Sequence, residues 1–241
     1  MGHLMRLVPF DDEGGMKRII FFVLFGLGGV SILVSLGIWQ MQRLAWKQDI
    51  LGEISARVSD EPIAMTEAFA MGSPKRYTAV GTQGSFGNGY LRILASRKNI
   101  GAVYRIVRPF EAVEMGRILV DTGWLPVATE VPLAPEWAII DGNLDHPNES
   151  DSFTPAPDLE GNIWFARDVP AMADALNTSP IMIVARDTGK TNLGVTAWPV
   201  DTVNIPNDHL QYAITWFLLA LIWGAMTAYF LLRSSRSPNE T

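Results

Sequence analysis

The sequence predicts a two-pass α-helical membrane anchor with an inserted α+β, mainly antiparallel β domain that forms a small barrel or curled sheet. Two apolar windows, residues 19–39 and 213–232, are each long enough to cross a hydrocarbon core of about 30 Å. No other window between them reaches this length, and the periodicity there is close to two, which is typical of strands. At 241 residues, the chain has room for one domain besides the spans.

The N-terminal window is predicted to be an uncleaved anchor. We expect residues 1–16 to be a disordered cytoplasmic tail and residues 17–39 to form the first span. The apolar run exceeds the roughly 7–15 residues of a signal-peptide core. Asp11, Asp12 and Glu13 precede it, and mitochondrial transit peptides are poor in acidic residues. These features favour a bacterial protein.

Residues 40–208 are predicted to form the inserted domain. The helix continues beyond Trp39 until Pro62 ends it, and residues 65–73 are expected to be loop-like with a short apolar piece. Asp168 is expected to cap a helix over 169–176, with Pro170 tolerated in its first turn. Gly87-Asn88-Gly89 is typical of a hairpin turn. Strands are predicted at 77–80, 90–94, 103–108, 117–120, 137–140, 164–167 and 181–184.

Residues 209–232 are predicted to form the second span and residues 233–241 a cytoplasmic tail. Lys17 and Arg18 precede the first span, and Arg233 and Arg236 follow the second. Basic residues concentrate on the cytoplasmic side, so the inserted domain is expected to be periplasmic, on a bacterial inner membrane. Arg43 and Lys47 depart from this pattern, since they follow the first span on the outer side.

The composition argues against several classes of function. The chain has no cysteine for redox chemistry or covalent haem attachment, and its net charge of −6 argues against nucleic acid as a partner. Gly81, Gly84 and Gly87 lack the following helix that a dinucleotide-binding loop requires. No catalytic triad or zinc-type spacing is present, so neither an enzyme nor a metal site is predicted.

His209 stands at the mouth of the second span. Pro206 can fix the entry to this helix and Asn207 can cap its first turn. The positive end of the helix dipole favours the neutral imidazole, which is the form that binds a metal or a haem iron. The alternative is an interfacial histidine that only hydrogen-bonds to backbone or lipid headgroups.

Aromatic and cationic side chains accompany His209 at the same predicted membrane depth. Trp39 and Arg43 share one face of the first helix, while Tyr212 and Trp216 extend the face of His209 on the second. Ring contact, a cation for propionates and an axial ligand are what a haem pocket requires. The alternative is an aromatic belt with an arginine that snorkels to the headgroups.

Six ordered motifs within the two-span frame resemble the surfeit locus protein family of cytochrome c oxidase assembly factors. The family usually has arginine where this chain has Thr122, so no role of that arginine is carried over. The motifs are Gly37-x-Trp39-Gln40-x-x-Arg43-x-x-Trp46-Lys47; Tyr77-x-x-Val80-x-x-x-Gly84-x-Phe86; Pro109-Phe110 followed by Leu119-Val120-Asp121; Gly123-Trp124-Leu125-Pro126; Asn162-Ile163-Trp164-Phe165 with Asp168 and Met172-Ala173; and Pro206-Asn207-x-His209-Leu210-x-Tyr212-x-x-Trp216.

The resemblance implies a non-enzymatic chaperone that binds haem a and helps to place it in the oxidase, with His209 as the suspected axial ligand. Trp39, Tyr212 and Trp216 would contact the macrocycle, and Arg43 would pair with a propionate. The implied partners are the oxidase catalytic subunit, the haem a synthase and membrane lipid. The alternative is a haem-free scaffold that stabilises the nascent oxidase subunit.

Overall fold

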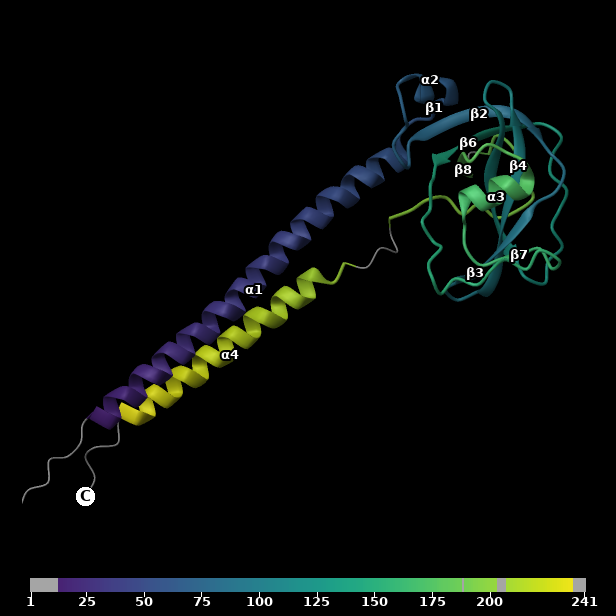
Figure 1. Cartoon of the computed structure of the whole chain (residues 1–241). Helices are drawn as coiled ribbons and strands as arrows, with labels where there is room; N and C mark the ends of the chain where they lie inside the picture. The colour runs from purple at the N-terminus through teal and green to yellow at the C-terminus, as the bar shows by residue number, and fades with distance from the viewer. Residues whose placement is uncertain (1–12, 188, 203–206, 236–241) are drawn as a thin grey trace, which may run out of the picture. The chain divides into compact units, whose positions relative to one another are not determined.

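The computed structural model describes residues 13–187, 189–202 and 207–235 (Figure 1). The chain divides into two compact units, Met1–Ile50 with Ile205–Thr241, and Leu51–Asn204. Each unit is described by itself. The predicted tail residues 1–12 and 236–241 lie outside the described residues, as does Pro206.

The first unit contains two long apolar helices, most of α1 (Glu13–Ser59) and all of α4 (His209–Ser235). The segments Ile19–Ser59 and His209–Arg233 contain windows with mean hydropathies of 2.6 and 1.8. By length and composition, both helices can cross a membrane. Helix α1 runs without interruption through the predicted boundary at Trp39, as the helical spacing beyond that residue indicates.

Glycines on one face of α1 let α4 approach closely. A Cβ atom built on Gly26 would lie 2.1 Å from Thr227 Cγ2, and one on Gly37 would lie 2.5 Å from Phe217 Cε1. Gly29 meets the Trp223 ring in the same way, at 2.3 Å. The residue numbers fall along α4 as they rise along α1, so the helices pack antiparallel. Small residues at the contact are the usual means of close helix packing in membranes.

The second unit is built on a closed ring of five strands. The ring runs β2–β6–β8–β5–β4 and closes because β2 also pairs with β4. All its pairings are antiparallel except β5–β8. The domain is therefore a barrel, with β3 and β7 continuing the sheet beyond β4. The strands are β1 (Ile63–Ala64), β2 (Ala79–Phe86), β3 (Leu91–Arg97), β4 (Gly101–Ala112), β5 (Gly116–Pro126), β6 (Ala138–Leu144), β7 (Ile163–Trp164) and β8 (Met182–Ala185).

Two hydrophobic clusters on opposite faces of the sheet stabilise the barrel. Phe110, Ile118 and Val120 belong to one cluster, whereas Leu119 belongs to the second, against Met172 of α3 (Val169–Leu176). Alternate residues of a strand point to opposite faces, so β5 is apolar on both. This explains the apolar run Ile118-Leu119-Val120 within β5.

The helix predicted at residues 169–176 is present as α3. Asp168 lies at its N-cap, and the Ala171 N–H donates to Asp168 Oδ1 at 3.1 Å. Pro170 lies in the first turn, where its missing N–H costs no hydrogen bond. The capping residue, the proline and the apolar spacing are local signals, and all three indicate a helix that begins at residue 169.

Three local predictions were wrong. Residues 65–73 contain helix α2 (Met65–Ala70), whose Met65 and Ala68 pack into the barrel core. The strand predicted at 164–167 is confined to β7, Ile163–Trp164. Gly87-Asn88-Gly89 does not form a hairpin, because β2 and β3 pair successively with the same edge of β4 rather than with each other.

Candidate functional site between the two helices

His209 is the first residue of helix α4. The Tyr212 N–H donates to the Asp208 carbonyl oxygen at 3.1 Å, which places Asp208 at the N-cap. The prediction that Asn207 caps this helix was therefore wrong by one residue. Within the described part of the chain, the Asn207 Oδ1 is buried and has no hydrogen-bond partner.

The imidazole of His209 contacts α1 through Gln40. His209 Nδ1 and Gln40 Oε1 lie 2.8 Å apart, although the residues are 169 positions apart in the sequence. Both side chains are partly buried. Sequence reasoning quoted Gln40 in a family motif but assigned it no role in the site. The available signal was its position three residues after Gly37 on the glycine face of α1.

Trp39 and Arg43 lie on a neighbouring face of α1. One residue of helix turns by about 100°, so Trp39 points away from the face of Gln40, and its side chain is 54% exposed. The Arg43 guanidinium lies over the Trp46 ring, 3.9 Å from its centroid. No contact described in the structure joins either residue to His209.

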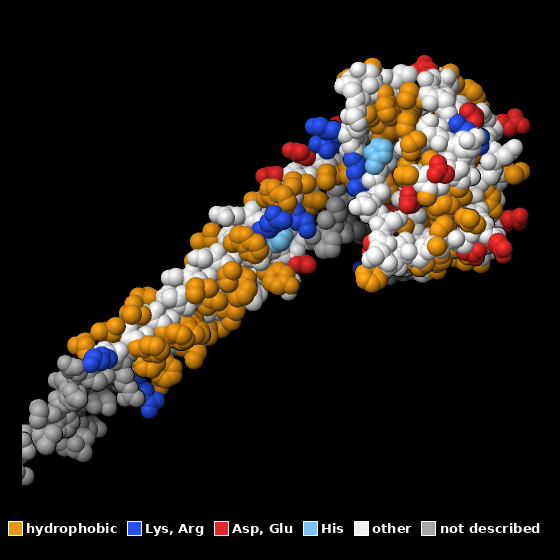
Figure 2. All heavy atoms as spheres, in the orientation of Figure 1, with side chains coloured by type: hydrophobic (Ala, Val, Ile, Leu, Met, Phe, Trp, Pro, Cys, Tyr) orange, Lys and Arg blue, Asp and Glu red, His pale blue; other side chains and the backbone are white. Residues whose placement is uncertain are grey.

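Tyr212 and Trp216 share one side of the helix pair with Trp39. An apolar groove of about 390 Å³ lies between the helices and includes Ile32, Leu219 and Trp223 in its walls. Residues seven apart share a helix face, so Trp39 extends the wall of Ile32, and Tyr212 and Trp216 extend the walls of Leu219 and Trp223. Figure 2 shows hydrophobic side chains along this pair, with basic residues and a histidine gathered where α4 begins.

The barrel domain contains a network of ion pairs that could be mistaken for an active site. Asp121 pairs with Arg105 and, at 3.6 Å, with Arg167, which also contacts Asp145 and Glu149. Burial raises the pKa of Asp121, and the two guanidinium groups oppose this effect. Burial also raises the pKa of Glu149, but its bonds with Arg167 outweigh burial, and the net pKa lies below 4.5. Every charge in this network faces a partner, which is typical of structural ion pairs.

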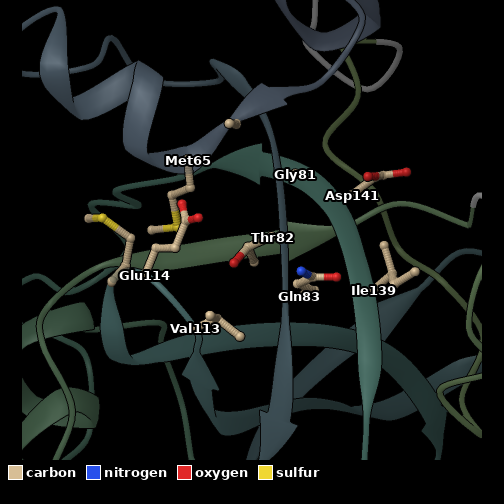
Figure 3. A pocket seen from close by; sticks show the side chains of 10 residues that line it. Met65, Gly81, Thr82, Gln83, Val113, Glu114, Ile139 and Asp141 are labelled. Atoms are coloured by element: carbon tan, nitrogen blue, oxygen red, sulfur yellow. The ribbon is translucent and has the colours of Figure 1, made fainter.

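A pocket of about 260 Å³ opens beside β2, between α2 and the turn that joins β4 to β5 (Figure 3). Its two carboxylates, Glu114 and Asp141, lie on opposite sides of it. Glu114 accepts a hydrogen bond from Thr66, and Asp141 pairs with Lys190 at 2.6 Å. Both carboxylates are engaged and separated, so the pocket does not present a pair for acid–base catalysis.

Comparison with known proteins identifies the family. A family profile described as the SURF1 family matches residues 27–221, which include parts of both long helices and the whole barrel. This chain belongs to the SURF1 family. It is 31% identical to surfeit locus protein 1 of Xenopus tropicalis over 208 residues, covering 76% of this chain and 67% of that protein. It is 30% identical to the SURF1-like protein of Rickettsia felis over 205 residues, covering 79% and 88%.

Thr122, where the family resemblance led us to expect arginine, lies in a β-bulge. Ile106 pairs with Gly123 and Val107 with Asp121, which leaves Thr122 as the extra residue of β5. Its hydroxyl donates to the Ile106 carbonyl at 3.0 Å. Gly123 has φ +130, and a Cβ there would lie 2.2 Å from the Thr196 carbonyl oxygen. The bulge is therefore supported without a charge at residue 122.

Proposed function

We propose that this protein is a membrane-bound assembly factor of a cytochrome oxidase that holds haem a transiently through His209. SURF1-family proteins are known as cytochrome oxidase assembly factors, and the match covers parts of both long helices and the whole barrel. The observation that carries the haem proposal is His209 itself. Its ring is held at Nδ1 by Gln40 at the start of an apolar helix, and its Nε2 has no hydrogen-bond partner among the described residues.

The neighbouring side chains fit a haem that lies along one side of the helix pair. Trp39 and Tyr212 are more than half exposed, and Trp216 is partly buried, so aromatic surface is available to a macrocycle. Arg43 is exposed and offers a charge-assisted hydrogen bond to a propionate, in place of its contact with Trp46. An open site with one protein ligand suits a carrier, since its cargo must also leave.

The proposed partners are the oxidase catalytic subunit, which receives haem a, and the haem a synthase, which supplies it. Lipid surrounds the two helices, and the barrel domain lies in the periplasm of a bacterial cell. The basic residues Lys17, before the first span, and Arg233, after the second, support this orientation, since basic residues concentrate on the cytoplasmic side.

The orientation is tested by labelling introduced cysteines, because the chain has none of its own. A membrane-impermeant maleimide added to spheroplasts is expected to label Ser150→Cys in the barrel domain. It is expected to label Ser237→Cys in the C-terminal tail only after lysis. The reverse pattern would overturn the periplasmic placement.

The haem proposal is tested by absorption spectra of the full chain, purified in mild detergent from cells that make haem a. The wild type is expected to show a reduced haem a band that His209→Ala loses. The control His146→Ala, at an exposed loop histidine, is expected to keep it. A band that survives in His209→Ala would remove His209 as the ligand.

A wild type without haem under these conditions would favour the haem-free scaffold. In that case, cells carrying His209→Ala would assemble oxidase with normal haem content. Under the carrier proposal, the same cells are expected to accumulate oxidase that lacks haem a.

A further inference from the structure

We propose that Gln40 is a positioning residue that holds His209 in the tautomer with its proton on Nδ1, so that Nε2 carries the free electron pair. In this role, the contact between α1 and α4 does more than pack the helices, since it fixes the tautomer of His209. It rests on the proposed function only in assigning the haem iron to Nε2. The hydrogen bond and the tautomer are properties of the chain alone.

The chemistry of the two side chains sets the direction of this bond. The 2.8 Å between His209 Nδ1 and Gln40 Oε1 is an ordinary N–H···O distance. An amide oxygen only accepts, so the imidazole nitrogen must donate. A neutral imidazole has one N–H group, and a proton on Nδ1 therefore leaves Nε2 unprotonated.

The packing on both sides of the contact keeps the two residues in reach. On α1, Gly37 lies against the Phe217 ring one turn before Gln40, and Leu44 is buried one turn after it. On α4, Ala213 is 1% exposed one turn after His209. The helices thus meet closely beside the pair, and apolar surroundings strengthen a hydrogen bond and penalise its loss.

Fixing Nδ1 has two consequences for a metal bound at Nε2. The ring cannot rotate freely, and the acceptor at Nδ1 makes Nε2 a more basic ligand. Removal of such an outer partner typically costs about 10–100-fold in metal affinity. Gln40→Leu is expected to weaken haem binding within this range while it leaves the helices folded.

The inference is tested first without haem. The full chain is labelled with ¹⁵N-histidine and studied by NMR in detergent micelles, at a pH of about 8.5 where an ordinary histidine is neutral. The chain has three histidines, and His209→Ala identifies the signals of His209. The wild type is expected to show a protonated Nδ1 and a bare Nε2 at His209.

Gln40→Leu is expected to abolish this preference and to give a mixture of tautomers. The matched control is Gln42→Leu, which changes an exposed glutamine on the same helix, two residues away, and is expected to keep the wild-type signals. A wild type protonated at Nε2, or a Gln40→Leu variant with the wild-type tautomer, would overturn the inference.

The second measurement is haem titration of the same proteins. Gln40→Leu is expected to bind haem about 10–100-fold more weakly than Gln42→Leu. In Gln40→Glu, a carboxylate accepts the bond more strongly and is expected to lower the reduction potential of the bound haem. If the tautomer result holds and the wild type binds no haem, the proposed function fails while the role of Gln40 stands. Equal haem affinity in Gln40→Leu and Gln42→Leu would overturn the claim that Gln40 strengthens His209 as an iron ligand.

Discussion

Arg105 and Asp121 form an ion pair between β4 and β5, and the Asp121 carboxylate is completely shielded from solvent. The Arg105 guanidinium also donates to the Trp198 carbonyl at 2.9 Å and lies 4.7 Å from the centroid of the Trp198 ring. The pair therefore connects the middle of the barrel to the segment that leads back toward α4.

Removal of the Asp121 charge is expected to destabilise the barrel strongly. Asp121→Ala leaves Arg105 without its buried counter-charge, which typically costs about 3–5 kcal/mol, whereas Arg167 keeps Asp145 and Glu149 as partners. Thermal unfolding of the full chain in detergent measures the loss. The control Glu160→Gln changes an exposed carboxylate and is expected to alter stability by less than about 0.5 kcal/mol. Equal melting temperatures for the two variants would contradict the structural role of the network.

A methyl group at Gly84 is expected to disturb the closure of the barrel. Gly84 pairs with Ala112 where β2 joins β4, and its added Cβ would lie 2.0 Å from the Glu111 carbonyl oxygen. The strands must separate to admit it, so Gly84→Ala is expected to cost about 1–3 kcal/mol.

Gly52→Ala is the matched control for this substitution. Its added Cβ would meet nothing within 4 Å, and the residue lies in helix α1. Alanine is the better helix former, so Gly52→Ala is expected to be neutral or to stabilise by up to about 1 kcal/mol. Denaturant unfolding of both variants provides the comparison. A loss of stability in Gly52→Ala as large as in Gly84→Ala would contradict the predicted effect on barrel closure.

Glu149 is expected to make the barrel sensitive to acid. Its folded-state pKa lies below the ordinary value of 4.5, because its bonds with Arg167 outweigh the effect of burial. A lowered carboxyl pKa stabilises the fold above the ordinary pKa, and this stabilisation is lost as the pH falls through the folded-state pKa. The side chain is 41% exposed, so solvent screening limits its contribution to about 1 kcal/mol.

Glu149→Gln is therefore expected to be less stable than the wild type at pH 7, and this difference is expected to shrink as the pH falls below the ordinary carboxyl pKa and through the folded-state pKa of Glu149. Melting temperatures measured across this range provide the test. Asp145, Asp121, Arg105 and Arg167 share the network and are the same in both proteins, so only the difference between the two curves reports on Glu149. A difference in melting temperature that grows as the pH falls would contradict the lowered pKa of Glu149.

The antiparallel packing of α1 and α4 is tested by a disulfide. A Cβ at Gly26 would lie 3.0 Å from the Thr227 Cβ, close to the roughly 3.5–4.5 Å of a disulfide. Gly26→Cys with Thr227→Cys is expected to cross-link on oxidation, so that fragments cleaved within the barrel stay joined until reduced. Gly28→Cys with Thr227→Cys is the control, since a Cβ at Gly28 meets nothing within 4 Å. Equal cross-linking in both pairs would contradict the helix register.

Local signals in the sequence were sufficient for α1, α3 and α4, but not for α2. A continuous apolar run is enough to predict a membrane-length helix, because the solvent acts on the segment as a whole. Asp168 and Pro170 were sufficient for α3, since a cap and a first-turn proline act within one turn. The six motifs were sufficient for the family, and family comparison confirmed it.

Only the tertiary structure decided which side chains meet. Gly87-Asn88-Gly89 has the composition of a hairpin, yet the strands around it pair with β4, because closure of the barrel outweighs the local turn preference. Arg105 and Arg167 join Asp121 only after the strand register is set.

The candidate site divides in the same way. His209 was predicted from the sequence, since its place at the start of an apolar helix is a local property. The role of Gln40 was not predicted, because its contact with His209, 169 positions away in the sequence, depends on how α1 and α4 pack against each other. The sequence by itself determined the two helices of membrane-spanning length, the β-rich domain and the family. The structure decided the closure of the barrel, the buried charges and the partner of His209, since each requires groups from distant segments to come within a few ångströms.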